Sequence, residues 1–99
     1  MDDITLAQFL KQPEKVQKTI QKYLYGNKNL FPIELTETQL RQFIEETMGG
    51  KLDSTYWTVG YELNVYDKLI DNEPLIVLFS DTTDIIEAYW QLACKIAGR

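Results

Sequence analysis

The stretch Ser54–Ser80 constrains the fold of this chain more than any other part of the sequence. Residues 57–66 alternate between two sets of side chains, and this period of two predicts a β-strand with one buried face. The set expected to face the core comprises Trp57, Val59, Tyr61, Leu63 and Val65. Residues 75–79 form a continuous apolar run, which is typical of a strand covered on both faces. A turn cluster that includes Asp71, Asn72 and Pro74 separates the two segments, so we expect an antiparallel β-hairpin.

Capping motifs predict two helices that begin before this hairpin. Thr5 with Gln8, and Thr36 with Gln39, match the capping box, in which the first side chain and the fourth bond each other's backbone N–H groups. The helix that follows Thr5 should be short, because Pro13 disfavours helical geometry at the residue before it. The helix that follows Thr36 is expected over about residues 37–48.

Two further helices follow from proline, glycine and apolar spacing. Proline is favoured at the first position of a helix, so a second helix should run from Pro13 to about Tyr25. After the hairpin, we expect Asp81 to cap a final helix that carries Asp84 in its first turn and ends at Gly98.

The expected architecture is therefore a single α+β domain over residues 1–99, in the order α-α-α-β-β-α. Three N-terminal helices precede an antiparallel hairpin, and a C-terminal helix packs on it. A lone two-stranded hairpin is marginal in water. We therefore expect helices on one face, and a sheet completed either by a short third strand at Leu30–Ile33 or by a second chain in a homodimer.

Composition narrows the environment and the kinds of partner. The net charge is −5, which argues against whole-molecule attraction to nucleic acid or anionic lipid. Residues 1–30 carry +2 and residues 31–99 carry −7, so the acidic body would suit a basic protein. No apolar run approaches the roughly 20 residues that span a bilayer, and the N-terminus lacks the basic start of a secretory signal. With a single cysteine, the chain is expected in the cytoplasm.

The residue types needed for common catalytic chemistry are scarce. The chain has no histidine, which removes the commonest general base and the commonest metal ligand. Cys94 therefore has no histidine to activate it, and we interpret it as a structural thiol. Neither of the usual glycine-rich phosphate loops occurs. We expect no catalytic, cofactor or metal site, although carboxylates from separate elements could still meet around Mg²⁺ in a metal-assisted enzyme.

A row of lysines marks the second predicted helix. Its members are Lys11, Lys15, Lys18 and Lys22. The row would serve either as the solvated face of an amphipathic helix or as a docking surface for nucleic acid. Because arginines and interleaved aromatic side chains are missing from it, nucleic-acid binding is the weaker interpretation.

Aromatic and polar side chains on the hairpin suggest a protein contact surface. Tyrosine and tryptophan offer large rigid contact areas with a polar tip. The candidate partner-binding residues are Tyr56, Thr58, Glu62, Asn64, Tyr66 and Trp90. Gly60 interrupts the strand and should mark a bulge or a close approach of another backbone segment.

The function that these patterns favour is a small, acidic, non-catalytic protein-binding domain of the inhibitor, immunity or assembly-accessory type. It would present a preformed surface to a macromolecule. The alternatives are a nucleic-acid-associated module that uses the lysine row and a metal-assisted enzyme that uses clustered carboxylates.

Overall fold

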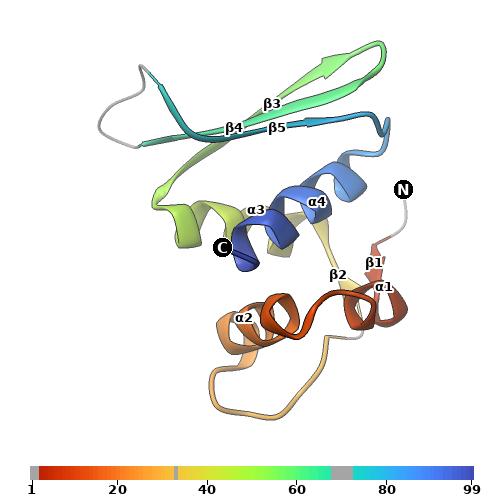
Figure 1. Ribbon diagram of the computed structural model, residues 1–99, viewed down its shortest axis with the longest axis vertical. Helices are drawn as coiled ribbons and strands as arrows, with labels where there is room; N and C mark the ends of the chain where they lie inside the picture. Colours follow the sequence, from red (N-terminus) through yellow and green to blue (C-terminus); the bar gives the residue numbers. More distant parts are fainter. Residues whose placement is uncertain (1–2, 33, 68–72) are drawn as a thin grey trace.

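A computed structural model describes residues 3–32, 34–67 and 73–99 of the chain. The elements follow in the order β1 (Ile4–Thr5), α1 (Leu6–Leu10), α2 (Glu14–Tyr25), β2 (Glu34–Leu35), α3 (Glu37–Met48), β3 (Gly50–Trp57), β4 (Gly60–Asp67), β5 (Pro74–Ser80) and α4 (Ile85–Ala97). Figure 1 shows three layers: the sheet of β3, β4 and β5, then α3 and α4, and then α1 and α2 with the short β1–β2 pair. The α+β class and the helices on one face of the sheet are as expected.

Both predicted capping boxes are present. The Thr5 Oγ1 atom accepts a hydrogen bond from the Gln8 N–H at 3.2 Å, and the Gln8 Oε1 atom accepts one from the Thr5 N–H at 2.9 Å. Thr36 and Gln39 make the same two bonds at 3.2 and 3.0 Å. These bonds satisfy N–H groups that have no partner within the helix, so the starts of α1 and α3 could be read from the sequence. Helix α3 ends at Gly49, whose φ of 68° is left-handed.

The start of the last helix was predicted wrongly. The N-cap is Asp84, whose Oδ1 atom accepts from the Ile86 N–H at 2.9 Å, and not Asp81. The hydroxyls of Ser80 and Thr82 accept bonds from the N–H groups two residues later, which keeps this connection in tight turns. The helix therefore begins three residues later than the sequence suggested.

The predicted hairpin is a three-stranded meander. Strands β3 and β4 pair antiparallel with Trp57 opposite Gly60, so a two-residue turn at Thr58 and Val59 divides the segment that was predicted as one strand. Strand β5 pairs antiparallel with β4, with Leu63 opposite Leu78. The third strand is therefore β3 and not Leu30–Ile33. Leu30 and Phe31 are exposed and belong to neither a strand nor a helix, and Ile33 lies outside the described residues. The turn predicted at Asp71 and Asn72 also lies outside them, and Pro74 begins β5.

The turn changes which side chains face the helices. In β3 the even-numbered residues face the helices, and after the two-residue turn the odd-numbered residues of β4 do so. Tyr61, Leu63 and Val65 therefore face inward, whereas Trp57 faces the opposite side. Trp57 is 53% exposed and Val59 is 77% exposed, so their predicted burial was wrong. Leu63 and Val65 are fully buried.

Helix α4 forms the centre of the molecule. It packs against the sheet on one side and against α2 on the other, with α3 alongside. Eight of its thirteen residues are buried, which is more than a one-sided amphipathic helix buries. Because apolar contacts surround it, this helix holds the sheet and the α1–α2 layer together.

Candidate contact surface on the open face of the sheet

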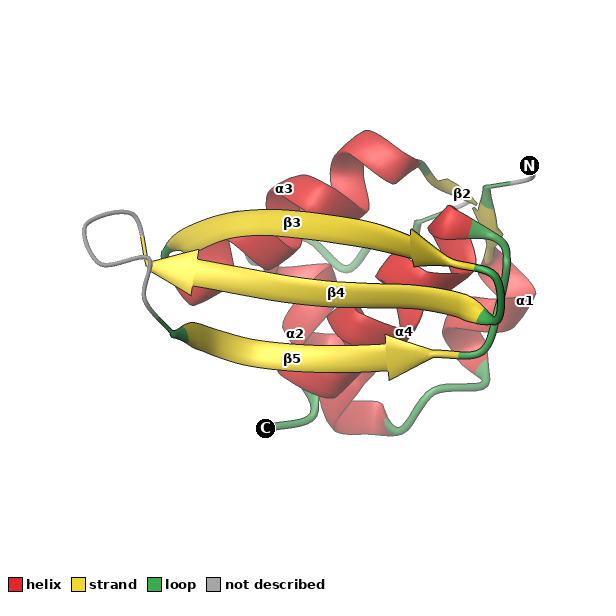
Figure 2. Ribbon diagram, turned by 90° about the horizontal axis from the view of Figure 1, so that it is seen from above, coloured by secondary structure: helices red, strands yellow, loops and turns green. Residues whose placement is uncertain are grey.

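In the part of the chain that the structure describes, no helix or strand lies over the face of the sheet that points away from the helices. Figure 2 looks directly onto this face, with all the helices behind the strands. We call it the outer face. The register assigns it Lys51, Asp53, Thr55 and Trp57 of β3, Glu62, Asn64 and Tyr66 of β4, and Val77 and Phe79 of β5.

The character of the outer face changes from one edge to the other. On β5 it is apolar, and the Phe79 side chain is 72% exposed. On β4 it is polar: the Asn64 amide donates to the Glu62 carboxylate at 2.8 Å, and Asn64 is buried between its neighbours. On β3 it carries the charges of Lys51 and Asp53. The outer face thus combines an apolar side with acidic and amide groups held in fixed positions.

The structure brings together three of the six predicted partner-binding residues. Glu62, Asn64 and Tyr66 lie along β4 on the outer face. Tyr56 lies on the other face of β3, near the end of the strand, where it is 57% exposed and contacts the Tyr61 ring edge-on at 5.1 Å between centroids. Thr58 lies in the β3–β4 turn.

Trp90 was assigned to the candidate surface wrongly. It is 3% exposed and belongs to the core. The prediction treated α4 as a helix with one covered side, whereas α2 covers the side away from the sheet. Trp90 therefore cannot contact a partner in this structure.

Sequence reasoning missed Phe79 and Trp57 on the outer face. The continuous run 75–79 was interpreted as covered on both sides, but only Ile76 in that run is buried. The two turn residues, Thr58 and Val59, include neither the glycine nor the asparagine that two-residue hairpin turns favour, so the sequence contains no clear signal of a turn after Trp57. Gly60 has a φ of 150°, and a Cβ atom there would overlap the Ser80 carbonyl oxygen. The predicted close approach of another backbone segment is thus confirmed.

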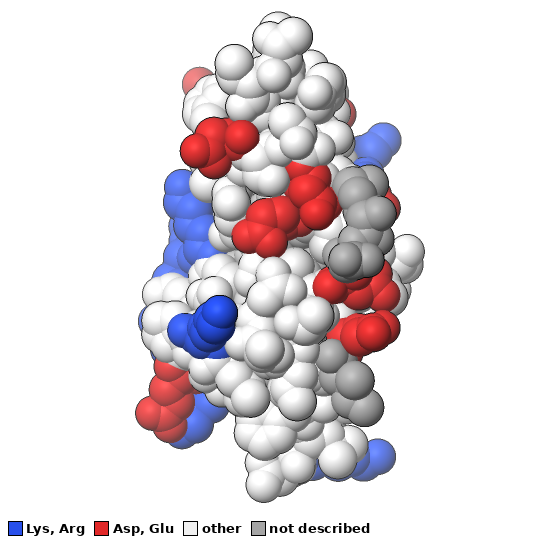
Figure 3. Space-filling model, turned by 90° about the vertical axis from the view of Figure 1, so that its right-hand side faces the viewer, with Lys and Arg blue, Asp and Glu red and all other residues white. Residues whose placement is uncertain are grey.

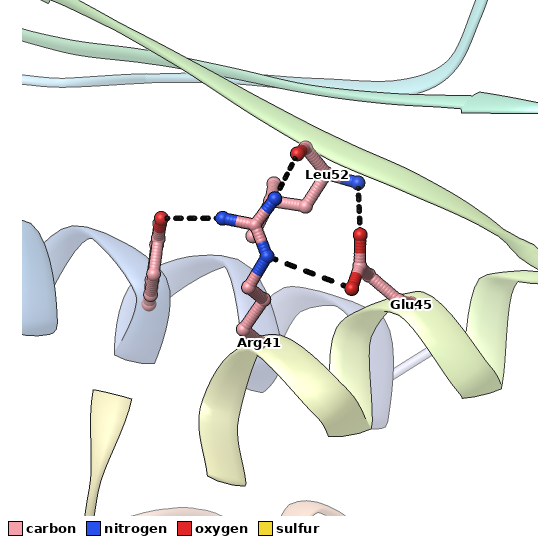
Figure 4. A network of polar contacts seen from close by, with 4 residues as sticks. Arg41, Glu45 and Leu52 are labelled. Atoms are coloured by element: carbon pink, nitrogen blue, oxygen red, sulfur yellow. Dashed lines mark hydrogen bonds and ion pairs between the residues drawn. The ribbon is translucent and has the colours of Figure 1, made fainter. Parts of the chain in front are cut away.

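Side chains of α3 bond the free edge of β3. The Arg41 guanidinium donates to the Leu52 carbonyl at 2.8 Å, and the Leu52 N–H donates to the Glu45 carboxylate at 2.8 Å (Figure 4). Arg41 also lies 3.6 Å from Glu45 and donates to the Tyr89 hydroxyl at 3.4 Å. This network links α3, β3 and α4, and it occupies both edge-facing backbone groups of Leu52.

The lysine row lies on the layer farthest from the sheet. Lys11, Lys15, Lys18 and Lys22 are all exposed. The Lys18 ammonium pairs with Glu14 at 2.7 Å, and this contact lowers the pKa of the Glu14 carboxyl. Lys18, Lys22 and Lys28 line a shallow depression of about 350 Å³ at the C-terminal end of α2. The lysine row therefore lies on the α1–α2 layer and the outer face on the sheet, so the two are separate surfaces.

Titratable groups outside the sheet serve packing. Burial, with a smaller contribution from the Glu87 charge, raises the pKa of the Cys94 thiol to about 12. The Tyr23 hydroxyl donates to Glu46 at 2.6 Å, and desolvation together with this bond raises the Tyr23 pKa to about 12.

Among residues 3–32, 34–67 and 73–99, no three Asp, Glu or Cys side chains are placed to hold a metal ion. In the same residues, no helix has the length and hydropathy to cross a bilayer.

Comparison with known protein families, with curated proteins and with solved structures finds no significant match.

Proposed function

We propose that this chain is a small non-catalytic protein-binding domain that contacts its partner through the outer face of the sheet. The observation that carries the proposal is the exposure of Phe79, at 72%, on a face that none of the described helices or strands covers. A large aromatic side chain that is exposed together with other apolar side chains of the same sheet is typical of a contact surface. Two further apolar side chains add to it: Trp57 is 53% exposed, and Leu75 is 44% exposed beside the irregularity in the β4–β5 pairing.

The charges favour a basic partner. Glu62 and Asp53 lie on the outer face with one lysine, and residues 31–99 as a whole carry −7. Opposite charge on a partner would steer the encounter, and the aromatic side chains would supply most of the affinity. A basic protein, including one that itself binds nucleic acid, matches this surface. Such a role is of the inhibitor, immunity or assembly-accessory type.

Affinity capture from the source cell with matched variants tests the proposal. Phe79→Ser removes the exposed ring, and Glu62→Lys reverses the charge beside it. Both side chains point away from the core, so circular dichroism should show an unchanged fold. We expect each variant to lose a protein that the wild-type chain retains.

The control reverses charge on the lysine row. Lys15→Glu with Lys22→Glu changes the net charge strongly and leaves the outer face intact, so the same protein should still be captured. Loss of capture in this control, with capture retained by Phe79→Ser and Glu62→Lys, would contradict the proposal and favour the nucleic-acid alternative. A gel shift at low salt would then test that alternative directly.

A further inference from the structure

In the half of β3 next to the β3–β4 turn, the free edge has two backbone positions, Ser54 and Tyr56, that no side chain among the described residues bonds. In an antiparallel strand, the N–H and C=O groups of every second residue point to the same edge. Arg41 and Glu45 bond those groups at Leu52, so the residues of β3 whose backbone groups face the free edge are Gly50, Leu52, Ser54 and Tyr56. Within the described residues, no side chain bonds the backbone of Ser54 or Tyr56 at this edge. The edge is closed at one end and open at the other.

The opposite edge of the sheet differs. The Lys95 ammonium donates to the Val77 carbonyl at 3.4 Å, in the middle of β5. Lys95 reaches this carbonyl from α4, and a charged side chain placed at the middle of an edge strand hinders the addition of another strand. The open half of β3 is therefore the available edge, and in Figure 1 the β3–β4 turn rises away from the helices.

We propose that a second copy of this chain pairs with the open half of β3, antiparallel and about a two-fold axis at Thr55. In this register Ser54 pairs with Tyr56 of the second copy, and Tyr56 pairs with its Ser54. Both are hydrogen-bonded pairs, so the two copies exchange four backbone bonds and form one six-stranded sheet. Leu52, which is already bonded, lies opposite Thr58 of the second copy and contributes no backbone bond.

The side chains suit pairing of the strand with itself. On the face of the sheet toward the helices, a small Ser54 lies opposite a large Tyr56 on both sides of the axis. The two Tyr56 rings lie diagonally across the axis, a position within reach of aromatic side chains. Each already contacts its own Tyr61, so four tyrosines would form a row across the interface. On the outer face Thr55 meets Thr55, a favourable cross-strand pair.

A groove lies where the register places the turn of the second copy. It has a volume of about 550 Å³ and is lined by Arg41, Gln42, Glu45, Glu46, Gly50 and Lys51. The register sets Lys51 opposite Val59 of the second copy, and Val59 is 77% exposed in the single chain. The exposed Val59 side chain of each copy would thus enter the groove of the other.

The charge distribution favours a second copy over a basic partner at this edge. Each chain carries −5, so an uncharged contact surface lets two copies approach without repulsion there. The eight residues 54–61 contain no charged side chain. The upper end of the molecule in Figure 3, where this end of the sheet lies, is mostly uncharged, whereas acidic residues gather below it. In the proposed register Asp53 lies opposite Trp57, and no like charges face each other.

This dimer is independent of the proposed function, because pairing along an edge leaves the outer face open on both copies. Sedimentation equilibrium of the full chain over a range of concentrations tests it. The wild-type chain should approach twice its monomer mass as concentration rises. Thr55→Lys and Thr55→Glu each place like charges together at the axis and should raise the dimer dissociation constant about tenfold or more. An equimolar mixture of the two variants should associate again.

Thr83→Lys is the matched control, since Thr83 is an exposed threonine away from β3, and it should associate like the wild type. Ser54→Pro is a second disrupting variant: it removes an N–H that faces the edge and leaves the β3–β4 bonds intact. It should stay monomeric and still capture the outer-face partner, whereas Phe79→Ser should lose capture and still dimerise. A wild-type chain that sediments as a monomer at every concentration, or Thr55 variants that associate like the wild type, would overturn the dimer.

Discussion

Replacement of Arg41 by methionine should destabilise the fold by about 2 kcal/mol, because this side chain joins α3 to the sheet. Its bond to the Leu52 carbonyl is 2.8 Å long and has a charged donor, a class that contributes about 1.5–3 kcal/mol. The ion pair with Glu45 adds little, since its side chains are 41% and 28% exposed and such pairs contribute below about 1 kcal/mol. The 3.4 Å contact with the Tyr89 hydroxyl is weak. Methionine keeps the apolar stem, so the loss reports the polar contacts.

Urea unfolding followed by far-ultraviolet circular dichroism measures this loss. The midpoint should fall while the dependence of free energy on urea stays unchanged, because the surface exposed on unfolding is the same. Arg41→Lys keeps the charge and loses the planar guanidinium, so its unfolding midpoint should lie between those of the wild type and Arg41→Met. Arg99→Met is the control: Arg99 is exposed at the C-terminus and should change stability by less than about 0.5 kcal/mol. A value for Arg41→Met as small as that of the control would refute the reasoning.

Three further predictions concern single positions. Gly60→Ala should lower the unfolding midpoint strongly, since the new Cβ atom meets the Ser80 carbonyl; a neutral result in urea unfolding would contradict the geometry of the turn. The raised Tyr23 pKa means that the folded protein holds this proton more tightly than the unfolded chain, so wild-type stability should fall between pH 10 and about 12. The fall should be smaller in Tyr23→Phe, and equal slopes in the two proteins would show that Tyr23 ionisation does not cause it. Cys94 should react slowly with a thiol reagent at neutral pH and fast in urea, and equal rates would show that the thiol is not buried.

The helices could be predicted because local chemistry specifies their starts. The bonds of Thr5 with Gln8, and of Thr36 with Gln39, depend only on residues close in sequence. The start of α4 could not be chosen in the same way. Asp81, Thr82, Thr83 and Asp84 are all suitable caps, and the choice depends on where β5 ends and how the helix reaches the core.

The sheet and the candidate surface were predicted less well for a physical reason. The alternation of side-chain types in the sequence continues through Thr58 and Val59. In the structure these two residues form a turn, and after it the other set of alternate residues faces inward. Because the prediction overlooked this shift, it placed Trp57 in the core, whereas Trp57 is exposed. Glu62, Asn64 and Tyr66 still shared a face because all three follow the turn. Trp90 is buried in a helix that packs against the sheet, α3 and α2, and no local pattern shows that α4 is covered on several sides.

The central claim is that the outer face is uncovered in the free chain and becomes covered by a partner protein. Nuclear magnetic resonance with a soluble paramagnetic agent measures this, since the agent speeds the relaxation of protons that it can approach. In the free chain the Phe79 and Trp57 rings should relax rapidly and the Leu63 methyl groups slowly, and the captured partner should then protect both rings. Rings already protected in the free chain, or left unprotected by the bound partner, would contradict the account.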